Sequence, residues 1–211
     1  MHMPLSPINL AVLVSGSGTT LQNLIDQIAQ KNLDARIKLV IGSRPGLLAL
    51  QRAIDANIPQ AVVDRREFSD VASFSRRIFE RIDEANVDLV CLAGRLCLLE
   101  IPPRYSGRVM NIHPALLPDF GGKGMYGLNV HKVMLDSGQK ISGCTVHFVD
   151  ATYDTGPIIL QRVCPVLDED TPESLAARVS AEEEIAYPLA IRLFAQGRLK
   201  IEGQRVRILP E

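Results

Sequence analysis

The sequence predicts an α/β fold: a single Rossmann-like domain over residues 1–211, with helices on both faces of a mostly parallel, twisted sheet. Two observations carry this prediction. Short apolar runs alternate with amphipathic segments of helix length through the first half of the chain, which is the pattern of repeated βαβ units. The chain has 211 residues, of which 46% are hydrophobic, and this suits one domain with a full core better than two.

The first half of the chain contains the clearest alternation. Residues 8–14 form an apolar run typical of a strand buried on both faces. Apolar positions then recur at helical spacing from Leu21 to Ile28, and residues 68–86 form an amphipathic helix with charges on its outer face. The same patterns predict further strands at 37–41, 61–63, 87–93 and 108–112, and a helix at 47–56.

The pattern changes after residue 115. A predicted helix at 128–136 is followed by two predicted strands, at 142–149 and 158–166. Thr171 has the features of an N-cap, and Gly197 ends the long helix that follows it.

Charge and apolar content argue against several classes of function. Lys and Arg number 23 and Asp and Glu number 24, for a net charge of −1, so there is no general attraction to nucleic acid or to an anionic membrane. The apolar run at 10–14 is too short for a signal or membrane segment, and we expect a cytoplasmic protein, either monomer or homodimer. Cys91, Cys97, Cys144 and Cys164 show no metal-ligand spacing, which favours reduced thiols over a metal site.

A glycine-rich loop lies between the first strand and the first helix, at residues 15–20. Glycines let the backbone approach an anion closely, and the N-terminus of a helix offers N–H groups and a favourable dipole. A dinucleotide site would need a third glycine where Leu21 stands, and the Gly-Lys-Ser/Thr of a Walker A loop is absent. The loop therefore suits one terminal phosphate, with a purely structural tight turn as the equal alternative.

Asn111 and His113 stand at the end of a predicted strand, where ligands bind in open α/β sheets. Strand alternation sends both side chains to one face. An amide donor beside an imidazole can stabilise a developing oxyanion and handle a proton. The alternative is a buried histidine with a structural role.

Two other segments allow two interpretations each. In the connection at 150–157, a turn role suffices for Asp150, whereas Asp154 is either a turn residue or a carboxylate that orients His113 and keeps it charged. The apolar stretch at 92–99 either lines a pocket for a flat ring or packs as a strand-to-helix junction.

Together these segments resemble the folate-dependent formyltransferases, and among them the phosphoribosylglycinamide formyltransferase branch. The likeness runs over roughly residues 8–202. The Asn-x-His-Pro-x-Leu-Leu-Pro run at 111–118, with Asp-Thr-Gly-Pro at 154–157, is typical of the whole family. The resemblance also rests on Leu-Ala-Gly at 92–94, and the glycine loop limits it to this branch.

The resemblance implies 10-formyltetrahydrofolate as formyl donor, 5′-phosphoribosylglycinamide as acceptor in de novo purine biosynthesis, and no metal. It implies ribonucleotide binding by the N-terminal half, with folate binding and catalysis in the C-terminal half. The implied catalytic residues are Asn111, His113 and Asp154. The implied acceptor-binding residues are Gly16, Ser17, Gly18, Thr19, Thr20 and Glu183. The implied folate-binding residues are Arg95, Leu96, Cys97, Leu98, Leu99, Asn111, Val149, Asp150 and Asp154.

The chain departs from the family pattern in three places. Arg95 stands where an aromatic residue is common, and Cys97 stands where an arginine helps to seat the folate. The loop at 120–127 is also longer than its usual form. Two alternatives stay open: a formyltetrahydrofolate deformylase, for which the glycine loop would hold no phosphate, and a noncatalytic folate- or nucleotide-binding protein.

Overall fold

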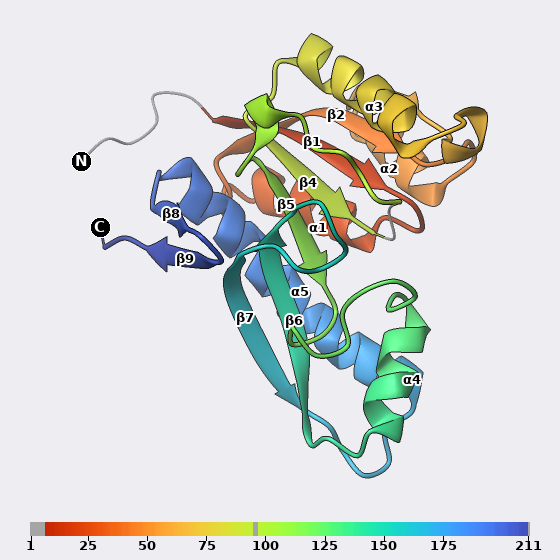
Figure 1. Cartoon of the computed structure of the whole chain (residues 1–211), viewed down its shortest axis with the longest axis vertical. Coiled ribbons are helices and arrows are strands. Elements are labelled where there is room, and N and C mark those ends of the chain that lie inside the picture. The colour runs from red at the N-terminus through yellow and green to blue at the C-terminus, as the bar shows by residue number, and fades with distance from the viewer. Residues whose placement is uncertain (1–6, 95–96, 211) are drawn as a thin grey trace. The chain divides into compact units, whose positions relative to one another are not determined.

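The computed structural model describes residues 7–94 and 97–210, and the chain divides into two compact units, Met1–Met110 and Asn111–Glu211. Strands and helices alternate through the first unit, whereas the second combines an antiparallel pair of long strands with two helices (Figure 1). The α/β class with a mostly parallel sheet is confirmed. That residues 1–211 act as one domain stays a prediction.

The first unit is built from βαβ crossovers. Its strands lie in the order β3-β2-β1-β4, and each neighbouring pair is parallel. Right-handed crossovers place α1 and α2 on one face of these strands and α3 on the other (Figure 1). The elements are β1 (Ile8–Val14), α1 (Thr19–Ala29), β2 (Ala35–Gly42), α2 (Leu48–Asp55), β3 (Gln60–Val62), α3 (Val71–Ala85) and β4 (Leu89–Ala93).

Parallel pairing brings two predicted functional segments of the first unit to one edge of its sheet. β1 and β4 end side by side, with Val14 paired to Ala93. A Cβ on Gly94 would lie 2.8 Å from Ser15 Oγ, and Gly94 has φ +142°. Only glycine therefore fits beside the start of the glycine loop.

The second unit begins within β5, and its last helix packs on its two long strands. α5 contacts both β6 and β7, which pair antiparallel. β9 extends this group parallel to β7 and pairs antiparallel with β8. The elements are β5 (Val109–His113), α4 (Leu128–Asp136), β6 (Ile141–Phe148), β7 (Ile158–Pro165), α5 (Pro172–Ala195), β8 (Leu199–Glu202) and β9 (Arg205–Ile208). The predicted cap of α5 is confirmed, since Ser174 N donates to Thr171 Oγ1 over 3.2 Å.

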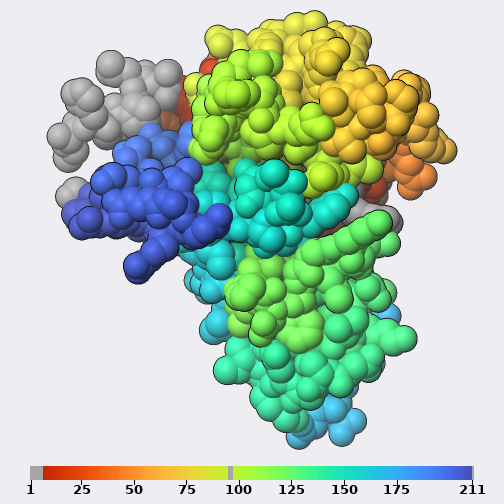
Figure 2. Space-filling model, in the orientation of Figure 1, coloured from red at the N-terminus to blue at the C-terminus, as the bar shows by residue number. Residues whose placement is uncertain are grey.

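The hairpin of β8 and β9 is not predicted by the sequence pattern. Its strands are short and mostly exposed, and Figure 2 shows the hairpin, in dark blue, at the surface. A strand that buries little apolar surface leaves little hydrophobic alternation to detect. Two short 3-10 turns, Arg65–Glu67 and Pro103–Tyr105, were also missed, because three residues are too few to show a hydrophobic period.

Candidate functional site

The three side chains predicted to be catalytic meet in the second unit. Asn111 Nδ2 donates to Asp154 Oδ1 over 3.4 Å, and His113 Nδ1 lies 3.5 Å from Asp154 Oδ2. Asn111 and His113 thus share one face of β5, as strand alternation predicts. The Asp154 side chain is only 12% exposed. Of the two interpretations of Asp154, the structure supports the partner of His113.

The turn that carries Asp154 is sterically fixed. Asp154 has φ 58°, a left-handed conformation that Asp and Asn adopt more readily than other side chains. A Cβ on Gly156 would lie 1.9 Å from the carbonyl oxygen of Phe148, so only glycine lets the chain turn back so closely. Gly122 N donates to Asp154 Oδ2 over 2.9 Å. These contacts hold the carboxylate toward β5.

Asp154 is ionised at neutral pH. Burial by itself would raise the pKa of Asp154, but contact with His147, the nearby His113 imidazole and the Gly122 amide together lower it. A buried carboxylate that keeps its charge can accept a proton from a neighbouring group.

His113 is the main correction to the sequence analysis. Its Nε2 donates to the Phe120 carbonyl over 2.8 Å, and its side chain is 4% exposed. Burial lowers the pKa of His113, and this outweighs the nearby charge of Asp154, which raises it. The expectation that Asp154 keeps His113 charged is therefore wrong. The neutral imidazole carries its proton on Nε2, where it donates to Phe120.

A fourth polar side chain, His147 on β6, belongs to the cluster and was missed. Its Nε2 lies 3.1 Å from Asn111 Nδ2 and 3.6 Å from Asp154 Oδ1. Its Nδ1 donates to the Phe148 carbonyl over 2.9 Å, and its Nε2 accepts from the Asn111 amide. Both hydrogens of the Asn111 amide thus have acceptors. The available signal was a histidine between Val146 and Phe148 in the strand predicted at 142–149.

His147→Ala is expected to lower turnover by roughly 10–100-fold, because the Asn111 amide loses a buried hydrogen-bond acceptor and is held less firmly. Steady-state kinetics with both substrates would measure it. His147→Gln should lose less, since its amide can still accept from Asn111. An alanine variant that folds and turns over at the wild-type rate would show that His147 has only a packing role.

The glycine loop of the first unit has the geometry of an anion site. The first hydrogen bond of the α1 ladder runs from Gln22 N to Gly18 O, so the N–H groups of Thr19 and Thr20 precede it. The first turn of α1 contains no acidic residue. Gly16 has nothing within 4 Å of a Cβ built on it, so the backbone is open to close approach.

Gly18→Ala is expected to lower the free energy of unfolding by about 1–3 kcal/mol, because Gly18 has φ 77°. A Cβ there would also lie 2.6 Å from Ala49 Cβ. Urea unfolding would measure the loss. Gly16→Ala is the matched control and should be nearly neutral, so equal stability of the two variants would contradict this account.

Glu183, predicted to hold the acceptor ribose, lies half-buried on α5. Burial, with a smaller effect of the Glu184 charge, raises the pKa of Glu183 to about 7. The preceding residue, Glu182, accepts instead from Arg162 Nε over 2.6 Å. A carboxyl group with this pKa ionises readily when a hydrogen-bond donor binds it. The role of Glu183 in ribose binding stays a prediction.

The predicted folate-binding residues fall into two segments. In the first unit Cys97 is exposed, Leu98 half-buried and Leu99 buried, whereas Arg95 and Leu96 lie outside the described residues. Leu99 is 3% exposed, so little of its side chain is open to solvent.

In the second unit, Val149 and Asp150 are half-buried. The Asp150 carboxylate accepts from Thr155 Oγ1 over 2.8 Å and from Thr152 N over 3.1 Å. This side chain stabilises its own turn, as the turn interpretation predicted. Folate binding by either segment stays a prediction.

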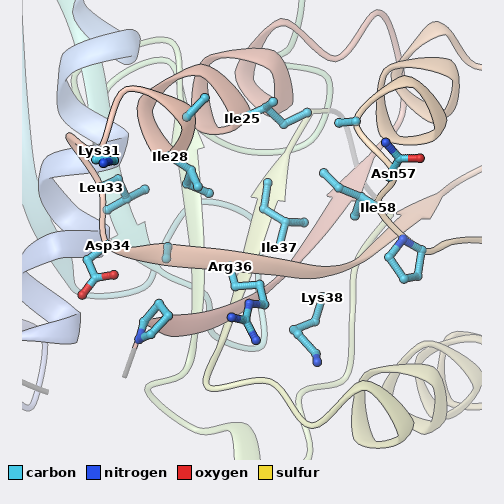
Figure 3. Close-up of a pocket in the computed structure, with 15 residues that line it drawn as sticks. Ile25, Ile28, Lys31, Leu33, Asp34, Arg36, Ile37, Lys38, Asn57 and Ile58 are labelled. Atoms are coloured by element: carbon cyan, nitrogen blue, oxygen red, sulfur yellow. The ribbon is translucent and has the colours of Figure 1, made fainter. Parts of the chain in front are cut away.

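A groove of about 820 Å³ lies elsewhere in the first unit, at the start of β2 (Figure 3). Of the predicted site residues that the structure describes, none lines it. The glycine loop follows the carboxyl end of β1, whereas this groove lies at the opposite ends of the strands. Its lining includes apolar and cationic side chains, among them Ile25, Ile28, Ile37, Ile58, Lys31, Arg36 and Lys38.

Three further observations concern only residues 7–94 and 97–210. In these ranges no group of three or more His, Cys, Asp and Glu side chains is arranged to hold a metal ion. No helix there has the length and apolarity to cross a membrane. The four cysteines are free thiols, and Cys97 alone among them is exposed.

Comparison with known proteins gives a consistent set of relatives. The formyl transferase family model matches residues 8–191. A phosphoribosylglycinamide formyltransferase of Haemophilus influenzae is 38% identical, over 92% of this chain and 90% of that protein. The crystal structure of glycinamide ribonucleotide transformylase 1 from Symbiobacterium toebii has 44% sequence identity and a TM-score of 0.89, over 97% of this chain and 95% of that one.

Some relatives are much longer than this chain. The trifunctional purine biosynthetic protein adenosine-3 of Drosophila melanogaster is 41% identical over 92% of this chain, but the match spans only 14% of that protein. The chain thus corresponds to about a seventh of that relative's length.

Proposed function

Because the chain belongs to the formyl transferase family, we propose that it transfers the formyl group of 10-formyltetrahydrofolate to the amine of 5′-phosphoribosylglycinamide. The products are N-formyl-phosphoribosylglycinamide and tetrahydrofolate, in de novo purine biosynthesis. The observation that carries the proposal is the cluster in which Asp154 contacts both Asn111 and His113. The family match over residues 8–191 supports the same reaction class.

In this reaction the acceptor amine attacks the formyl carbon directly, with no covalent enzyme intermediate. A bond forms between the amine nitrogen and the formyl carbon, and the bond from that carbon to the folate nitrogen breaks. The Asn111 amide and the His113 imidazole stabilise the oxyanion that develops on the formyl oxygen. Ionised Asp154 accepts the amine proton through a water molecule and passes it to the departing folate nitrogen.

The position of the His113 proton sets a condition on this mechanism. Nε2 donates to the Phe120 carbonyl. A substrate oxygen can accept from this nitrogen only if the hydrogen bond to Phe120 breaks. Protonation of Nδ1, which faces Asp154, supplies the charge that an oxyanion requires. Nδ1 takes up this proton from solvent when the carboxylate and the formyl oxygen together outweigh the effect of burial, and it releases the proton to solvent with the products.

Substrate contacts are proposed for each unit separately. In the first unit, the amides of Gly18, Thr19 and Thr20 hold the acceptor phosphate, and the segment at 97–99 contacts the folate. In the second unit, Glu183 accepts from the ribose hydroxyls. Location in the cytoplasm and a monomeric or homodimeric state stay predictions.

The test is formyl release from 10-formyltetrahydrofolate, followed spectroscopically with and without 5′-phosphoribosylglycinamide. We expect release that depends on the acceptor, with one formylated product for each tetrahydrofolate formed. Equal release without the acceptor would identify a hydrolase. Folate binding with no release in either case would identify a binding protein, and either result would overturn the proposal.

A further inference from the structure

Helix α2 contacts the glycine loop through two loop carbonyls. Ala49 N donates to the carbonyl of Gly16 over 3.3 Å, and Arg52 Nε donates to the carbonyl of Ser17 over 2.9 Å. In a trans peptide the C=O and the N–H point in opposite directions. Both carbonyls face α2, and the N–H groups of Ser17 and Gly18 are therefore turned away from it.

Arg52 also ties the loop to the first turns of α1. Its Nη1 donates to Gln22 Oε1 over 2.8 Å. Gln22 Nε2 donates to Asp26 Oδ1 over 2.9 Å, so the amide oxygen of Gln22 is the end that faces Arg52. A guanidinium is planar and presents its donors in a fixed fork. One half-buried cation thus holds the loop and the helix in a set geometry.

The geometry points to Arg52 as a positioning residue for phosphate binding: it fixes the peptide between Ser17 and Gly18 so that the loop amides face a phosphate-bearing acceptor. The inference rests on the proposed function, and Arg52 lies outside the segments that carry the family resemblance. Arg52 acts through the backbone of the loop and not at the formyl carbon. Its loss should therefore weaken acceptor binding and leave the chemical step unchanged.

Two substitutions test this role against one control on the same helix. Arg52→Ala is expected to raise KM for 5′-phosphoribosylglycinamide about tenfold, with kcat and the folate KM within about twofold of wild type. The acceptor KM of Arg52→Lys should lie between the values of wild type and Arg52→Ala, because an ammonium is a single point donor and cannot span both acceptors. Gln51→Ala removes an exposed side-chain hydrogen bond to Asp55 and should leave kcat and both KM values unchanged.

Titration calorimetry with ribose 5-phosphate measures phosphate binding by the loop without any turnover. Arg52→Ala should weaken the Kd about tenfold, and Gln51→Ala should leave it unchanged. If the unaltered chain binds ribose 5-phosphate but transfers no formyl group, the proposed function fails and the Kd values still decide the role of Arg52. The inference is overturned if the unaltered chain does not bind ribose 5-phosphate. It is equally overturned if the folded Ala and Lys variants keep the wild-type Kd, or if the loss falls on kcat alone.

Discussion

Asp154→Asn is expected to lower kcat by roughly 10²–10⁴-fold while the chain still folds. The carboxylate accepts from the Gly122 amide over 2.9 Å and faces His113 Nδ1 at 3.5 Å. Asparagine keeps the shape of the side chain and tolerates φ 58°, but its amide cannot accept and pass on the amine proton. Steady-state kinetics should place the loss in kcat, with KM for both substrates little changed.

The same variant tests the contact with His113. Burial lowers the pKa of His113, and the Asp154 charge opposes that effect. Removal of the charge should therefore lower the pKa of His113 further, and an NMR titration of the imidazole in both proteins would measure it. An unchanged pKa of His113, together with near wild-type turnover, would contradict the role assigned to Asp154.

Stability should respond to pH in a defined direction. Burial would raise the pKa of Asp154, but contact with His147, the nearby His113 imidazole and the Gly122 amide lower it below the ordinary 3.8. The unfolded chain therefore takes up the proton first as pH falls. The contribution of Asp154 to the free energy of unfolding is complete above the ordinary pKa and is lost as pH falls through the folded value. Urea unfolding should show a steeper loss on acidification for wild type than for Asp154→Asn.

Removal of either proposed oxyanion donor is expected to lower kcat by roughly 10²–10³-fold. Asn111→Ala removes the amide that lies 3.1 Å from His147 Nε2 and 3.4 Å from Asp154 Oδ1. His113→Ala removes the imidazole whose Nδ1 lies 3.5 Å from Asp154 Oδ2. In both variants the transition state loses a hydrogen-bond donor at the oxygen where negative charge develops. Single-turnover rates measure this loss directly, because they report the chemical step.

The control separates chemistry from folding. Asn32→Ala removes an exposed amide that donates to Gln30 Oε1 over 3.1 Å, and it should leave turnover unchanged. Circular dichroism and thermal unfolding would show that the site variants remain folded. Turnover within tenfold of wild type in a folded Asn111→Ala or His113→Ala protein would remove that residue from the mechanism.

Much of the fold and site could be predicted because the information is local in the chain. The run at 8–14 is β1 with the same bounds, and the helix predicted at 128–136 is α4. Alternation along one strand was enough to place Asn111 and His113 on a common face. The relevant neighbours lie within a few positions, and the backbone period alone decides which side chains share a face.

The sequence alone thus determined the order of the main strands and helices from β1 to α5, the glycine loop, and the motif residues Asn111, His113 and Asp154. Tertiary structure decided the rest, because the deciding contacts join residues far apart in the chain. His147 joins the cluster through Asn111, 36 positions away, and Arg52 reaches Ser17 across 35. The protonation of His113 was also decided there, since burial is a property of the packed chain and here outweighs the charge of Asp154.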